Sequence, residues 1–164
     1  GMTQQGVLHY VGNKAGLAAM VMKEFYDPTS MPGDFLASGL PGSDRDAPHF
    51  PAYLRYVVRE NAKRRDLVQM FAILQAESID PDHPAHDYFE HRPAIIWQTL
   101  SNYQWKLPPQ IGTWENFKPL HRMALEAMDG IQLRWLRSDP IDLYDEWIAF
   151  ERILFPSPVW DNYR

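Results

Sequence analysis

The densest group of side chains able to carry out chemistry lies between Asp80 and His91. His83, Asp87 and His91 follow one another at intervals of four residues, so on a helix they would share one face. Imidazole and carboxylate groups at this spacing can hold a divalent metal ion. The pattern supports one hypothesis, a helical metal-dependent enzyme that uses His83, His86, Asp87 and His91.

The same segment also fits the start of a helix. Aspartate is common there because its side chain caps free backbone N–H groups. The sequence offers no second His/Glu pair that can be assigned to a facing helix. We therefore predict no metal site and no cofactor, and we keep the metal-dependent enzyme as an alternative.

Aromatic side chains form a second group, spread over the central part of the chain. Pockets between the helices of a bundle are lined by such residues together with a few polar groups that orient the ligand. Any single aromatic residue could instead simply pack in the core. We predict that a mostly apolar small molecule binds within residues 49–138, at Tyr53, Phe71, Gln75, Tyr88, Trp97, Tyr103, Trp114, Phe117 and His121.

Sequence motifs of other enzyme classes are missing. No serine lies in a Gly-x-Ser-x-Gly frame, and there is neither a glycine-rich phosphate loop nor a dinucleotide-binding fingerprint. We therefore predict that the protein is not an enzyme.

The composition bounds the compartment and the partners. The 164 residues include no cysteine and carry a formal net charge of −5. This excludes disulfides and suits a reducing compartment. No run approaches the roughly 18 apolar residues of a membrane span, and no signal peptide is visible. We expect a cytoplasmic protein with no membrane partner, whose acidic balance makes DNA binding by this chain weak or absent.

Helices must position these side chains, because apolar residues recur three to four apart along most of the chain and no segment alternates. The fold class expected is all-α, a helical bundle. Amphipathic stripes are expected from Phe50, from Leu67, over residues 114–136 and over residues 141–154. A further helix should run toward Trp105, with a kink or break at Pro93.

Prolines and glycines interrupt this periodicity between Asp27 and Pro48, which predicts a linker or long loop with one helical turn near Phe35. The expected organisation is an N-terminal segment of residues 1–26, a linker of residues 27–48 and a main body of residues 49–164.

The first stretch of the chain resembles part of a helix-turn-helix. A short helix capped by Thr3 would place Val7, Leu8 and Val11 on one face, and a turn would lead into a second helix. This pattern resembles the recognition helix, and the helix after it, of the tetracycline-repressor (TetR) family of bacterial regulators. The matching positions are Thr3, Gly6, Val7, Leu8, His9, Tyr10, Val11, Asn13, Lys14 and Leu17, with valine at position 11 in place of the usual phenylalanine.

Two further stretches, residues 76–89 and 128–136, are similar to parts of the ligand-binding body of the same family. The resemblance implies a ligand-responsive repressor with a C-terminal ligand-binding and dimerisation domain and a partial helix-turn-helix remnant. It also implies that the chain lacks the first helices of the DNA-binding domain. In the intact protein the residues expected to reach operator DNA are Thr3, Gln4, Gln5, His9, Tyr10 and Lys14.

The resemblance also implies a homodimer formed through the last two helices. Independent support comes from the final helix, which is apolar over too wide an arc for the surface of a monomer. Gly130 lies within a strongly periodic helix, where glycine permits close approach of another backbone. The expected interface residues are Met128, Ile131, Trp135, Tyr144, Trp147, Ile148 and Leu154. A second alternative is a ligand-binding and dimerisation module that does not bind DNA.

Overall fold

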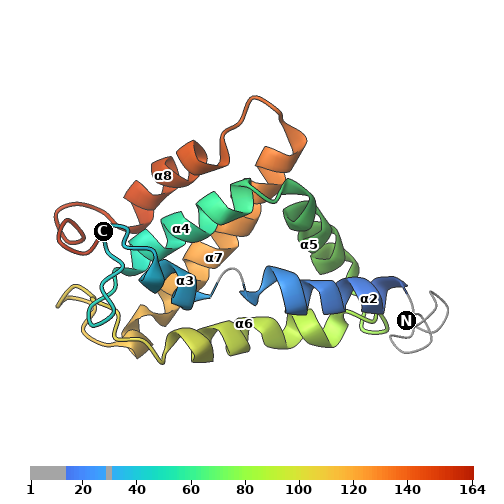
Figure 1. Ribbon diagram of the computed structural model, residues 1–164, viewed down its shortest axis with the longest axis horizontal. Helices are drawn as coiled ribbons and strands as arrows, with labels where there is room; N and C mark the ends of the chain where they lie inside the picture. Colours follow the sequence, from blue (N-terminus) through green and yellow to red (C-terminus); the bar gives the residue numbers. More distant parts are fainter. Residues whose placement is uncertain (1–13, 29–30) are drawn as a thin grey trace.

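The computed structural model describes residues 14–28 and 31–164, and these residues form an all-helical structure (Figure 1). No strand occurs among them, and a single backbone bridge pairs His49 with Lys106. The all-α class is confirmed. The helical elements are α2 (Lys14–Val21), the π-helical η1 (Met22–Tyr26) that continues it, α3 (Pro32–Ala37), α4 (Phe50–Ala62), α5 (Arg65–Glu77), α6 (His86–Leu100), α7 (Trp114–Arg137) and α8 (Leu143–Leu154).

The predicted recognition helix lies outside the described residues, and with it Thr3, Gln4, Gln5, His9 and Tyr10. Lys14 is the first residue of α2. None of the helices in the described ranges is both long enough and apolar enough to cross a membrane.

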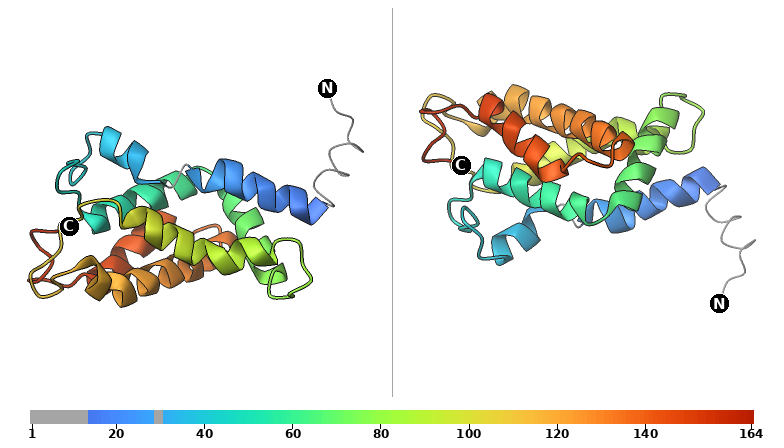
Figure 2. Two further views of the ribbon diagram at one scale, coloured as in Figure 1. Left: turned by 90° about the horizontal axis from the view of Figure 1, so that it is seen from below. Right: turned by 90° about the horizontal axis from the view of Figure 1, so that it is seen from above.

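The core lies where α4, α7 and α8 pack together, and α5 joins this group to α2 and η1 (Figures 1 and 2). α6 runs along the opposite side, below α4 and α7 in Figure 1. The C-terminal residues lie at the end of the molecule away from α2. The largest fully buried side chains include Trp147, Phe35, Phe50, Phe117, Phe155 and Met22.

The long helix α7 follows the expected periodicity closely. Thr113 caps it by accepting a hydrogen bond from the backbone N–H of Asn116 at 3.3 Å. Its buried side chains recur three to four residues apart, which is the pattern of one helix face. They are Phe117, His121, Ala124, Met128, Gln132 and Trp135.

The sequence predicts a kink or break in α6 at Pro93. The helix continues from His86 to Leu100 through this proline, so it does not break there. Pro93 is exposed, so water can bond the backbone carbonyl that the proline deprives of its partner. Trp105 lies beyond the helix, and its indole N–H donates to the carbonyl of Leu100 at 2.7 Å.

Part of the predicted linker packs on the core. Its one expected helical turn is α3, and Phe35 from this turn is 1% exposed beneath the rings of Tyr53 and Tyr56. Met22 and Tyr26, from the segment before it, are also buried in the common core. The described part of residues 1–26 therefore shares its core with the body.

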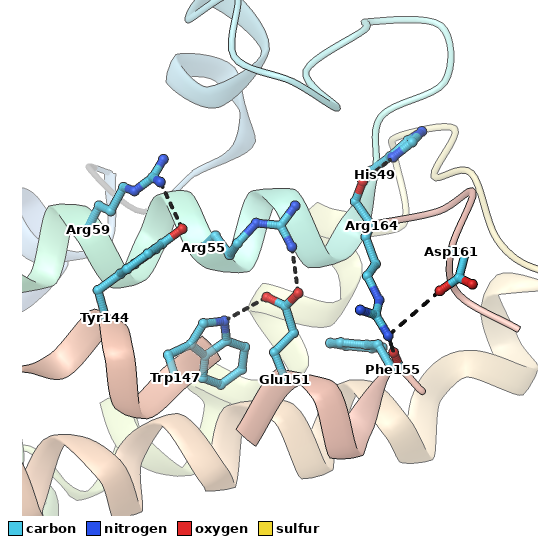
Figure 3. A network of polar contacts seen from close by, with 9 residues as sticks. All are labelled: His49, Arg55, Arg59, Tyr144, Trp147, Glu151, Phe155, Asp161 and Arg164. Atoms are coloured by element: carbon cyan, nitrogen blue, oxygen red, sulfur yellow. Dashed lines mark hydrogen bonds and ion pairs between the residues drawn. The ribbon is translucent and has the colours of Figure 1, made fainter. Parts of the chain in front are cut away.

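A buried carboxylate fastens α8 to α4 (Figure 3). Glu151 is 5% exposed, pairs with Arg55, and accepts a hydrogen bond from the Trp147 indole at 3.1 Å. Burial raises the pKa of Glu151, although Arg55 acts in the opposite direction. Nearby, the Arg164 guanidinium donates to the carbonyl of Phe155 at 2.6 Å, which holds the last residues against the end of α8.

A tight turn before α4 requires a glycine. Gly42 has a φ of +84°, and its carbonyl accepts a hydrogen bond from the His49 N–H at 2.8 Å. A Cβ atom at this position would lie 2.8 Å from the Cβ of Ala52. Gly39 has a similar φ of +67° but open space around it.

Gly42→Ala is expected to lower the free energy of unfolding by about 3 kcal/mol, and Gly39→Ala by about 1 kcal/mol. Both variants carry the backbone strain, and only Gly42→Ala adds the collision with Ala52. Urea unfolding followed by circular dichroism measures both. Equal losses would show that the turn does not lie against α4 as described.

Candidate functional site

A narrow cavity lies between α4, α6, α7 and the end of η1. Its volume is about 70 Å³, which holds a few water molecules and is smaller than the roughly 300–1,000 Å³ of typical small-molecule sites. Its walls are mostly apolar and include Phe50, Leu54, Val57, Ile96, Leu100 and Leu125. The polar groups on the walls are Asp27, Asn61, Arg92, Asp129 and Gln132.

An ion pair closes one side of this cavity. The Arg92 Nε donates to Asp27 Oδ1 at 2.9 Å, and the Tyr88 hydroxyl donates to Asp27 Oδ2 at 2.8 Å. Both carboxylate oxygens are therefore bonded to α6. The side chains of Asp27 and Arg92 are only 17% and 18% exposed, so water screens the pair weakly.

The electrostatics keep Arg92 charged. Burial lowers the pKa of Arg92, but Asp27, Tyr88 and Tyr26 together outweigh burial and the pKa is raised. The guanidinium carbon lies 4.8 Å from the centre of the Phe71 ring and 5.9 Å from that of Tyr26. Burial also raises the pKa of Tyr26, to about 12, so this phenol stays neutral.

A second carboxylate, Asp129 of α7, lies in the same wall. The Gln75 amide donates to Asp129 Oδ2 at 3.1 Å. Burial raises the pKa of Asp129, while the hydrogen bond from Gln75 and the charge of Arg92 act against this rise. The walls of the cavity thus carry one cation, Arg92, and two carboxyl groups, Asp27 and Asp129.

The cavity adjoins a second hollow of about 220 Å³ between α5, α6 and α7. The residues common to both are Phe71, Arg92, Ile96, Leu125 and Asp129. These side chains line both spaces, and the two ionisable groups among them are Arg92 and Asp129.

The predicted ligand residues do not form one pocket. Tyr53 and Phe71 line the cavity, Gln75 lines the outer hollow, and Tyr88 reaches the site through Asp27. The other five line neither space and lie in an aromatic cluster that contacts the cavity wall through Phe50. In that cluster Trp97 stacks on Trp114 at 4.5 Å and contacts His121 edge-on, Phe117 is fully buried, and Tyr103 packs against Trp105.

Asp27, Arg92 and Asp129 were absent from the sequence prediction. Asp27 was assigned to the linker, and its partner lies 65 residues away, a separation at which sequence spacing carries no signal. The one local signal is the placement of Tyr88 four residues before Arg92, which puts both on one face of α6.

The histidines of the metal-dependent alternative do not come together as a metal site within the described residues. His83 Nδ1 accepts from the N–H of Ala85, His86 Nδ1 bonds the carbonyl of Ser78, and His91 Nδ1 bonds the carbonyl of Asp87. His86 and His91 each lie 3.9 Å from Glu90 Oε2, whereas His83 lies 3.6 Å from Glu77. Within residues 14–28 and 31–164 no three His, Asp or Glu side chains converge to hold a metal ion.

Four of the predicted dimer residues lie inside the protomer. Met128, Trp135, Trp147 and Leu154 are at most 7% exposed because α4, α7 and α8 cover them. Their place in a dimer interface is therefore corrected, since buried side chains offer no surface to a partner. Ile131, Tyr144 and Ile148 are half-buried, and the exposed large apolar residues of α7 and α8 are Met123, Leu133 and Ile153.

Comparisons with protein families, with curated proteins and with solved structures find no match to this chain. The chemistry of the site is therefore argued from its own residues.

Asp27→Asn is expected to lower the free energy of unfolding by about 2–3 kcal/mol, because it leaves the Arg92 cation buried without its charged partner. The control is Glu146→Gln, which breaks a pair with Arg134 at 3.0 Å whose side chains are 31% and 64% exposed. That change should cost at most about 1 kcal/mol in the same urea unfolding experiment. Similar losses in the two variants would contradict the buried character of the Asp27–Arg92 pair.

Asp129→Asn is expected to stabilise the protein at pH 7 and to leave it unchanged at pH 3. The pKa of Asp129 is higher in the folded than in the unfolded chain, so wild-type stability falls as pH rises from the unfolded toward the folded pKa. The asparagine side chain does not ionise, so the variant does not lose this stability as pH rises. Its side-chain oxygen can still accept the hydrogen bond from Gln75. Unfolding curves at both pH values, with the exposed Asp66→Asn as control, measure this. A variant less stable than wild type at pH 7 would refute it.

Proposed function

We propose that this chain is the ligand-responsive body of a TetR-type transcriptional regulator. The observation that carries the proposal is the bonding of Asp27, the residue directly after η1, to the wall of the cavity through Arg92 and Tyr88. A molecule that enters the cavity moves Arg92 and so changes the hold on the helix that ends at Asp27.

The geometry of the N-terminal helix supports this coupling. α2 and η1 run without a break from Lys14 to Tyr26, and the predicted recognition helix precedes them in the chain. A change at Asp27 therefore acts on the C-terminal end of the helix formed by α2 and η1. The predicted recognition helix precedes the N-terminal end of this helix in the chain. The proposed coupling is an equilibrium between two positions of the helix formed by α2 and η1. A ligand shifts this equilibrium only through its different affinity for the two positions.

Operator contacts are proposed for Thr3, Gln4, Gln5, His9, Tyr10 and Lys14 in the intact protein. Glutamine can bond adenine in the major groove, and threonine, tyrosine and lysine can reach phosphates. The cavity of about 70 Å³ is smaller than a typical small-molecule site, so the proposed ligand displaces Arg92 and occupies the cavity together with the adjoining hollow of about 220 Å³.

A homodimer is proposed through the outer faces of α7 and α8. Met123 is 54% exposed, Leu133 is 40% exposed and Ile153 is 73% exposed. A Cβ at Gly130 would meet nothing within 4 Å inside the protomer, so this side of α7 is open to another chain. Two-fold pairing of such a surface suits a palindromic operator.

One observation favours a second candidate, a ligand-binding and dimerisation module without DNA contact. The net charge of −5 opposes the phosphate neutralisation that supplies most non-specific DNA affinity. The two candidates share the cavity and differ only in whether the protein binds DNA.

A DNA-binding selection separates them. The protein is expected to enrich a palindromic site from a genomic fragment library and to bind it about a thousandfold more tightly than unrelated DNA. Asp27→Asn should weaken operator binding about tenfold, because α2 and η1 lose the ion pair that attaches them to α6. Glu146→Gln should leave operator binding unchanged.

Failure to enrich any palindrome would favour the module without DNA contact. Enrichment with unchanged binding by Asp27→Asn would retain the regulator and refute the coupling through Arg92.

A further inference from the structure

A groove of about 400 Å³ runs between α6 and α7, on the side of the aromatic cluster. This volume lies in the range of small-molecule sites. Leu125 lines both the groove and the cavity described above, so it stands between the two spaces. The residues that give the groove its chemistry are Trp97, Lys118, His121 and Arg122.

Trp97 supplies a supported aromatic wall. Its ring stacks on Trp114 with the centres 4.5 Å apart and the planes 13° apart, and it meets His121 edge-on at 5.1 Å. The Lys118 ammonium lies 5.1 Å from the centre of the Trp97 ring. The ring is therefore held in place before any ligand arrives.

Two buried polar atoms beside this wall have no hydrogen-bond partner among the described residues. They are Nε1 of Trp114 and Nε2 of His121, and His121 is only 4% exposed. A buried polar atom without a partner destabilises the fold, so a hydrogen bond to a ligand would be favourable there. Burial, with a smaller contribution from Lys118, lowers the pKa of His121 to about 4, so near neutral pH this ring is uncharged and can donate one hydrogen bond.

The rim of the groove is positively charged. Lys118 and Arg122 are exposed, and neither forms an ion pair with any carboxylate in the described part of the chain. The chain as a whole is acidic, with a net charge of −5, so this pair is a local feature rather than part of a basic surface. An anion is the complementary partner.

We propose that the groove binds a planar aromatic molecule that carries a carboxylate. The aromatic ring takes the place of the Lys118 ammonium against Trp97, the carboxylate pairs with Lys118 and Arg122, and one of its oxygens accepts a hydrogen bond from His121. This site is separate from the cavity and does not depend on the proposed regulatory function.

Isothermal titration with 2-naphthoate tests the proposal, and its neutral isostere 2-naphthamide tests the role of charge. The wild-type protein should bind 2-naphthoate with a dissociation constant below about 1 mM and 2-naphthamide about tenfold more weakly. The exposed double variant Lys118→Gln/Arg122→Gln should weaken 2-naphthoate binding about tenfold, and Trp97→Leu should weaken it similarly.

The matched control is Lys106→Gln, which removes another cation placed over an aromatic ring, 5.7 Å from the centre of Tyr163. It should bind 2-naphthoate as the wild type does. Thermal unfolding of each variant shows that it is folded. Equal binding of the acid and the amide, unchanged binding by the double variant, or no binding near 1 mM would each overturn the proposal.

A last variant separates the groove from the cavity. Val57→Trp fills the cavity wall with a larger side chain and should leave 2-naphthoate binding intact. Loss of binding in folded Val57→Trp, together with normal binding by the Lys118→Gln/Arg122→Gln variant, would place the ligand in the cavity and refute the groove site.

Discussion

The position of the N-terminal helix depends on a buried ion pair between Asp27 and Arg92. The pair joins the residue after η1 to the middle of α6, and Tyr88 occupies the second carboxylate oxygen. Burying either charge alone would be costly, so the two side chains stabilise each other's location. The stack of Tyr26 on Phe71, with ring centres 5.0 Å apart, adds an apolar contact to α5 at the same place. The proposed coupling between the cavity and the N-terminal helix depends on the Asp27–Arg92 ion pair.

Much of the fold could be predicted from the sequence because helix faces leave a local pattern. The spacing from Trp114 to Leu136 identified nearly the whole of α7, which extends from Trp114 to Arg137. The single turn near Phe35 was also predicted and is α3. The sequence left a kink or a break at Pro93 open, and on the exposed side of α6 this proline does not break the helix.

The site was harder to predict because its residues meet only in the folded chain. Periodicity identifies an apolar face but not the chain that covers it, so Trp147 was assigned to a partner although the protomer itself buries it completely. The aromatic residues formed one set in the sequence, yet Tyr53 and Phe71 line the cavity whereas Trp97 and His121 line the groove. Asp27 lay in a segment that read as a linker, where nothing local signals a partner such as Arg92.

The most direct measurement of the central claim is the distance between α2 and α6. The protein has no cysteine, so spin labels can be attached uniquely at Met20→Cys and Ile95→Cys, two exposed positions on these helices. Pulsed electron resonance should give one narrow distance distribution in this background. Adding Arg92→Leu should broaden it and extend it to longer distances, because α2 and η1 lose their attachment to α6. The same narrow distribution in both proteins would contradict the account.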